Sequence, residues 1–255
     1  MDPAVVGTIV FAFSFGGVLL GMALQALLPQ HHLDNDSSST VKLGIGLVAT
    51  MTALVLGLVT ASAKSSFDAV DSTVKQTAVD ILALDRTLAR YGGETSEIRK
   101  ALKEALHQRI ETIWPAGSRQ PVDLDPLGRG RASQAEALTH AIRSLVPQSD
   151  AQRALQARAL DHAEKLLESR WMVLAGTESS VPMPFLVILL FWLSITFASF
   201  GLFAPRNATV VATLLVCALS VASAVFLVLE MDTPFNGMMR VSADPLRFAY
   251  QHLNQ

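Results

Sequence analysis

Four long apolar runs stand out along the chain, and each is long enough to cross a lipid bilayer as a helix. They lie at residues 4–28, 43–63, 185–203 and 208–229, and the second of them carries no formal charge. About 20 apolar residues in a helix span the roughly 30 Å hydrocarbon core of a membrane. The pattern therefore predicts an all-α integral membrane protein with four transmembrane helices. Glycines within the first run also predict close packing of that helix against another.

The helix predicted for the second apolar run continues beyond the end of that run. No Gly or Pro follows Lys64 until Gly92, and apolar residues recur at intervals of three and four positions. Such spacing is typical of a helix with a packed seam. We expect one helix over residues 41–91, capped by Ser39 or Thr40 and about 75 Å long. The seam consists of Phe67, Val70, Val74, Thr77, Ile81, Leu84, Leu88 and Tyr91.

These patterns divide the chain into membrane and water-soluble segments. Residues 1–64 hold the first two spans, residues 181–230 hold the last two, and residues 65–180 form a helical domain between them, with a short segment over 231–255. Within that domain we expect a helix ending at Trp114, an irregular connection over 116–131, and two helices opened by capping boxes at 133–136 and 149–152. Most Lys and Arg residues lie in this domain, so the positive-inside rule places it and both termini in the cytoplasm.

Composition and charge exclude several functions. The chain is 51% apolar and 16% charged with a net charge of −2, so nothing favours binding to nucleic acid. Its single cysteine, Cys217, can form no internal disulfide. No phosphate loop, nucleophile motif or converging set of metal ligands occurs, and we interpret His31 and His32 as part of a solvated turn. We therefore expect no enzyme, no cofactor and no metal site.

One face of the second span carries small and hydroxyl residues at intervals of three and four positions. Two interpretations fit: close packing against another helix, or the wall of a water-filled path. Lysines at both ends of the span favour a path for anions, although lysines that anchor a helix at the membrane surface would look the same. This small-residue stripe consists of Gly46, Thr50, Ala53, Gly57, Thr60 and Lys64.

Several segments resemble a known family. After the last span come Glu230, Pro234, Phe235 and Gly237, which resemble the post-membrane motif of the bestrophins. A closer resemblance, over nearly the whole chain, is to the bacterial bestrophin-like membrane proteins. It rests on the segments KLGIG (42–46), ASAKSSF (61–67), LDR (84–86), RYG (90–92), FGLFAPRN (200–207) and LEMDTPF (229–235).

The resemblance implies a multi-pass protein of the bacterial inner membrane. It also implies a homopentamer in which five copies of the second span line an axial pore. Bestrophins are typically chloride or other anion channels, and bacterial relatives can pass cations. Eukaryotic members bind calcium through acidic residues after the motif, which residues 236–243 lack, and carry neck phenylalanines, which residues 42–64 lack. A constriction here would therefore use Leu, Val or Met.

Together these observations predict an oligomeric ion channel in the lipid bilayer, with inorganic ions as its cargo and the small-residue stripe as its lining. Self-association is also expected because the seam would otherwise be exposed, unless an intrachain bundle covers it. Anions are favoured, with Lys42, Glu230 and Asp232 at the pore mouths. Two alternatives stay open: a cation channel with Glu230 and Asp232 as an acidic ring, and a non-conducting scaffold or sensor that binds a partner through residues 115–131.

Overall fold

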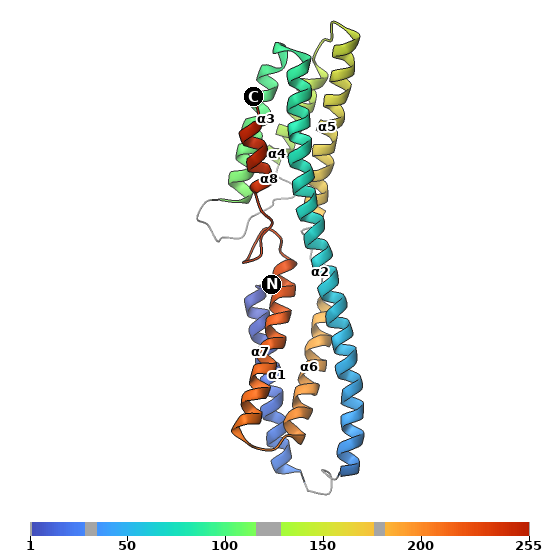
Figure 1. The fold of residues 1–255 in the computed structure, drawn as a ribbon, viewed down its shortest axis with the longest axis vertical. Coiled ribbons are helices and arrows are strands. Elements are labelled where there is room, and N and C mark those ends of the chain that lie inside the picture. The colour runs from blue at the N-terminus through green and yellow to red at the C-terminus, as the bar shows by residue number, and fades with distance from the viewer. Residues whose placement is uncertain (1, 29–34, 116–128, 176–181, 255) are drawn as a thin grey trace. The chain divides into compact units, whose positions relative to one another are not determined.

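The computed structural model describes residues 2–28, 35–115, 129–175 and 182–254, and within these residues the regular secondary structure is entirely helical (Figure 1). The chain divides into two compact units. The membrane unit comprises residues 1–65 and 179–232, and the second unit comprises residues 66–178 and 233–255. The helices are α1 (Pro3–Leu27), α2 (Asn35–Tyr91), α3 (Ser96–Ile113), α4 (Arg129–Arg143), α5 (Asp150–Ala175), α6 (Met183–Phe203), α7 (Ala208–Met231) and α8 (Asp244–His252), with a 3-10 turn at Gly93–Thr95.

The four helices expected as membrane spans are all present as candidate spans. Helices α1, α6 and α7, together with the first part of α2, are long and apolar enough to cross a bilayer. The expectation of one unbroken helix through Lys64 is also confirmed, because α2 runs without interruption to Tyr91. Its predicted start was wrong: α2 begins at Asn35, so Ser39 and Thr40 lie inside the helix. Polar residues that favour caps are tolerated within a helix that continues into a long apolar run.

Helices α1 and α6 pack with their backbones in contact. A Cβ atom placed on Gly21 would lie 2.0 Å from the carbonyl oxygen of Ala198, and one placed on Gly201 would lie 2.1 Å from that of Val18. A Cβ on Gly17 would lie 2.8 Å from the carbonyl oxygen of Ser194. Only glycine fits at such distances, which is the reason membrane helices use small residues at close interfaces. Gly17 and Gly21 of the glycine face expected for the first span therefore form the contact with α6, whereas a Cβ atom on Gly16 would meet no described atom within 4 Å.

The turn between α6 and α7 is fastened to the end of α1. The Arg206 guanidinium donates from Nη2 to the carbonyl oxygen of Met22 at 2.7 Å and from Nε to Gln25 Oε1 at 3.1 Å. The Asn207 side chain accepts a hydrogen bond from the Val210 N–H at 2.8 Å and so caps α7. These contacts hold the ends of three spans together at one edge of the membrane unit.

The second unit is a helical bundle around the last seven turns of α2. The seam residues Val70, Val74, Ile81, Leu84 and Leu88 are all buried in one core. Residues of α3, α4, α5 and α8 complete that core, together with Phe235 and Val241 from the segment before α8. The seam is thus covered within the chain, as the intrachain alternative expected, and its exposure is no argument for self-association.

Two helices of the second unit differ from expectation. Helix α4 begins at Arg129, four residues before the capping box at 133–136, so Ser133 lies inside the helix. Helix α5 begins as expected, since the Ser149 hydroxyl accepts a hydrogen bond from the Gln152 N–H at 3.2 Å. Helix α8 was not predicted, although Asp244 and Pro245 supply an N-terminal signal for it. The connection expected over 116–131 falls mainly outside the described residues.

Candidate pore-lining surface

The membrane part of α2 presents three different faces. One face packs within the membrane unit: Thr52 and Ala63 are buried, and Ala63 lies in a cluster with Val228 of α7 and Leu186 of α6. This face explains how α2 is held against the other spans. The remaining two faces are the small-residue stripe and a row of leucines.

The small-residue stripe is open to the surroundings of the chain. Gly46, Thr50, Ala53 and Gly57 are exposed, and Thr60 is half-buried. A Cβ atom placed on Gly46 or on Gly57 would meet no other atom within 4 Å. Within the described chain these glycines are therefore not required for packing, in contrast to Gly21 and Gly201.

The threonine hydroxyls of the stripe bond to their own helix. Thr50 Oγ1 donates to the carbonyl oxygen of Leu47 at 2.7 Å, and Thr60 Oγ1 donates to that of Leu56 at 2.7 Å. Each hydroxyl hydrogen is thereby used, so the oxygen presents acceptor lone pairs outward. In this rotamer the stripe offers partners for a cation or for water, and donation to an anion requires rotation of the hydroxyl.

The third face of α2 is an exposed apolar row. Leu43, Leu47, Leu54 and Leu58 are between 63% and 78% exposed in the single chain. Such side chains are stable against lipid tails or against another apolar protein surface. The small-residue stripe therefore lies between this row and the face that packs within the chain.

The four charged residues expected at the pore mouths have different surroundings. The Lys42 ammonium lies 5.4 Å from the ring centroid of Phe203, so this side chain is directed to α6. Lys64 is exposed, Asp232 is half-buried, and Glu230 is only 4% exposed. Lys42 and Lys64, which are both exposed, are thus the more accessible of the four to an ion outside the chain.

Three residues of the post-membrane motif, Pro234, Phe235 and Gly237, lie in a turn that packs onto the end of α3, whereas Glu230 lies in the last turn of α7. Phe235 is 2% exposed and meets the ring of Trp114 edge to face at a centroid distance of 5.7 Å. The Val241 N–H donates to the carbonyl oxygen of Pro234 at 2.8 Å, and Trp114 Nε1 donates to that of Val241 at 2.8 Å. Gly237 has a φ of 80°, a conformation that favours glycine. The motif therefore acts as a packing element, and Trp114 is a partner that sequence reasoning missed.

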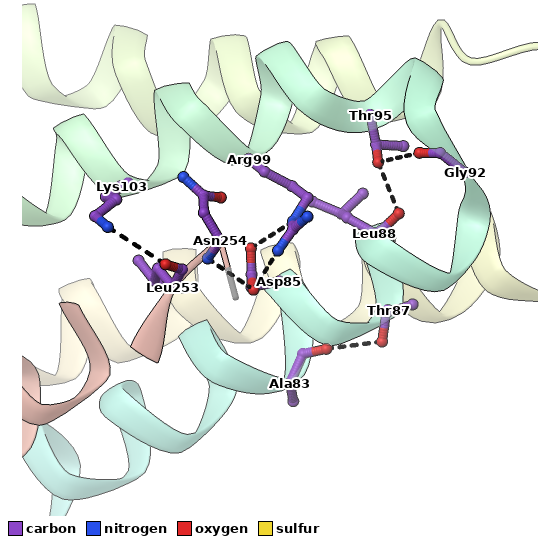
Figure 2. A network of polar contacts seen from close by, with 10 residues as sticks. All are labelled: Ala83, Asp85, Thr87, Leu88, Gly92, Thr95, Arg99, Lys103, Leu253 and Asn254. Atoms are coloured by element: carbon purple, nitrogen blue, oxygen red, sulfur yellow. Dashed lines mark hydrogen bonds and ion pairs between the residues drawn. The ribbon is translucent and has the colours of Figure 1, made fainter. Parts of the chain in front are cut away.

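A second unpredicted feature is a buried ion pair between α2 and α3 (Figure 2). Asp85 is fully buried, and its two carboxylate oxygens accept from Arg99 Nε at 2.7 Å and from Arg99 Nη2 at 3.0 Å. The hydrogen bond that Arg99 donates to Asp85 raises the pKa of the Arg99 guanidinium. Near it, Lys103 Nζ donates to the carbonyl oxygen of Leu253 at 3.3 Å, which ties the end of α8 to α3. The sequence signal was a carboxylate beside the seam residue Leu84.

Within the described residues, no group of three or more His, Cys, Asp or Glu side chains could hold a metal ion. His107, His140 and His162 lie on α3, α4 and α5, one on each helix. His31, His32 and Asp34, which we interpret as a solvated turn, lie outside the described residues.

Four apolar helices of spanning length, one of them continuing into a packed helical bundle, define an all-helical integral membrane protein. A family model described as the bestrophin-like domain matches residues 12–246, and the chain belongs to this family. The family is known for channels rather than enzymes. Membership of the chain in this family therefore indicates a channel-type membrane protein. No curated protein and no solved structure matches the chain. The family expected from the sequence is thus confirmed, whereas subunit number, pore lining and ion preference stay predictions.

Proposed function

We propose that the chain forms a homo-oligomeric ion channel, a pentamer by its family, in which α2 of each copy lines an axial pore. The observation that supports this proposal best is the open small-residue stripe of α2. A Cβ atom on Gly46 or Gly57 would meet no described atom within 4 Å, and exposed backbone and hydroxyl oxygens along such a face can replace part of the hydration shell of an ion. The exposed leucine row beside it would then face lipid or the next copy.

We propose anions, chloride among them, as the favoured cargo. Lys64 is an exposed cation at the end of the stripe, and the described part of the α2 span carries no carboxylate. Two observations favour the alternative of a cation channel: the outward lone pairs of Thr50 and Thr60, and the accessible Asp232. The channel would lie in the bacterial inner membrane with both termini in the cytoplasm, as the positive-inside rule predicts.

The lining can be tested with cysteines at neighbouring positions of α2. In a Cys217→Ala background, which removes the exposed native thiol, we expect a charged thiol reagent to reduce the conductance of Gly57→Cys at least severalfold in liposomes. Leu58→Cys is the matched control, because this adjacent residue lies about 100° away around the helix on the leucine row. Its conductance should stay within error of the background.

Two results would contradict the proposal. Equal block of Gly57→Cys and Leu58→Cys would mean that the stripe is not the lining. A folded oligomer without conductance under any ion gradient would favour the scaffold, whose expected contact at residues 115–131 lies mainly outside the described part of the chain.

A further inference from the structure

A pocket of about 390 Å³ opens in the membrane unit between α2, α6 and the first turns of α7. Small residues on two of these helices, Gly46 and Ala49 on α2 and Ala204 at the end of α6, leave the space. Phe200 and Leu214 supply much of its wall. The α2 side extends from Lys42 to Ala49, which corresponds to about 10 Å along the helix. Pockets of this size are large enough to bury part of an organic ligand.

The chemistry of the pocket changes from its mouth to its interior. Among the described residues that line it, Lys42 is the charged one, and it stands at the end of the uncharged run of α2. Its ammonium lies against the ring of Phe203 and forms no ion pair with the described residues. Arg206, at the same edge of the unit, is engaged by Met22 and Gln25 of α1. Among the described residues at this edge, Lys42 is therefore the cation best placed for a ligand in the pocket.

Position and charge together identify the kind of ligand. The end of a membrane span lies at the level of the lipid headgroups, and the pocket runs inward from there along apolar side chains. Water in such a space would find few polar partners, whereas an acyl chain would bury its surface there. A lysine near the membrane surface attracts an anionic headgroup, and the N-terminal turn of α7, which contributes Val210 to the lining, also favours negative charge.

We infer that the pocket binds one anionic phospholipid per chain, with an acyl chain between α2 and α6 and the phosphodiester on Lys42. This assigns to Lys42 a function in lipid binding, apart from ion conduction, and it places Gly46, which lines the same pocket, at the lipid site and not in the pore lining. The site requires only the membrane unit, so it holds whether or not the oligomer conducts ions.

The test compares lipids that differ only in the headgroup. The purified full-length protein, freed of native lipid in a neutral detergent, is titrated with phosphatidylglycerol or phosphatidylcholine of identical acyl chains, and bound lipid is counted by native mass spectrometry. The wild type should prefer phosphatidylglycerol. Lys42→Gln should bind phosphatidylglycerol about fivefold more weakly and phosphatidylcholine unchanged, and Lys42→Arg should retain the preference.

A second pair of variants tests the cavity itself. Ala49→Trp fills the pocket and should weaken the binding of both lipids, whereas Ala212→Trp, on the exposed surface of α7 outside the pocket, should bind as the wild type does. Helical circular dichroism and the elution volume of each variant show that it is folded. Should Ala49→Trp fail to fold, the comparison of Lys42→Gln with Lys42→Arg decides alone.

A photoreactive side chain distinguishes lipid from a second copy of the chain as the occupant. With benzoylphenylalanine in place of the half-exposed Phe200, we expect adducts with lipid in native membranes. Adducts formed mainly with another copy would overturn the inference, and so would equal affinity of wild type and Lys42→Gln for phosphatidylglycerol. Neither result bears on conductance, so the failure of the lipid site and the failure of the channel proposal are distinguishable.

Discussion

Asp85 of α2 and Arg99 of α3 form a two-point ion pair in the interior of the second unit, with donor–acceptor distances of 2.7 and 3.0 Å. The carboxylate is fully buried, while the Arg99 side chain keeps 18% of its surface exposed. Because a buried carboxylate is stable only with its partners in place, this pair fixes how α3 lies along α2. The backbone N–H of Asn254 also reaches Asp85 Oδ2, at 3.4 Å, so the end of the chain depends on the same group.

Removal of this carboxylate should destabilise the protein strongly. We expect Asp85→Ala to lower the free energy of unfolding by about 3 kcal/mol, because Arg99 would remain largely buried without its partner. The measurement is chemical unfolding of the full chain in detergent, with proteolysis at the C-terminus as a second readout. The control is Asp71→Ala, whose partner Lys75 is 63% exposed and whose loss should cost about 0.5 kcal/mol or less. Similar effects of the two substitutions would argue against a structural role for the buried pair.

The α1–α6 contact predicts that replacing two glycines of α1 by alanine has very different effects on stability. Gly21→Ala should lower the thermal stability of the solubilised protein, with a loss of about 2 kcal/mol or more, because the new methyl group would collide with the Ala198 carbonyl. Gly16→Ala meets no atom within 4 Å and should be neutral or slightly stabilising, since alanine favours helices. An unchanged melting temperature for Gly21→Ala would mean that α1 and α6 are not in backbone contact.

Because Tyr91 is buried, we expect its ionisation to lower the stability of the folded protein at alkaline pH. Burial, with a smaller contribution from Glu94, raises the pKa of its phenol above the ordinary value of 10.0. At neutral pH the phenol is uncharged in both the folded and the unfolded state. At higher pH the unfolded chain releases a proton that the folded chain keeps, so this contribution to stability is lost as pH rises. We expect Tyr91→Phe to show a flatter decline in unfolding free energy between pH 9 and about 11 than the wild type.

Tyr91→Phe should also be at least as stable as the wild type at pH 8. The Tyr91 hydroxyl is buried and has no hydrogen-bond partner within the described residues, so its removal relieves a desolvation cost of about 1 kcal/mol. Tyr250→Phe, a half-buried tyrosine on α8, serves as the control. If the unfolding free energy of Tyr91→Phe declined at alkaline pH as steeply as that of the wild type, ionisation of Tyr91 would not contribute to the decline.

The charge at Lys64 should influence ion selectivity if α2 lines a pore. In liposomes, Lys64→Glu should shift the ratio of anion to cation permeability toward cations severalfold, measured as a change in reversal potential under a salt gradient. Lys100→Glu reverses another exposed charge, on α3, and should leave the ratio unchanged. A ratio unaffected by Lys64→Glu in a conducting protein would remove Lys64 from the pore mouth.

Much of the fold could be predicted because burial leaves a periodic trace in the sequence. The apolar runs gave the four spans, the spacing from Val70 to Leu88 gave the continuous helix, and the glycines of the first run predicted a close contact. The pattern could not say which surface covers a seam, because intrachain and intersubunit burial select the same side chains. The structure shows α3, α4, α5 and α8 in that place.

Features that depend on pairing between distant positions were not predictable in the same way. The partner of Asp85 lies on another helix, and hydrophobic periodicity carries no information about which guanidinium meets which carboxylate. The start of α2 was missed because Ser and Asp side chains near residue 36 are equally suited to a cap and to a first helical turn. The small-residue stripe could be located but its role could not, since packing and ion conduction favour the same residue types.

The glycine contacts between α1 and α6 have a mechanical consequence. With backbone against backbone at Gly21 and Gly201, no layer of side chains separates the two helices, and neither can slide or rotate without a steric clash. The two helices are therefore expected to move together as one rigid body. Rearrangement inside the membrane unit falls to α2, which is held to its neighbours by ordinary side-chain contacts that can exchange rotamers and re-form.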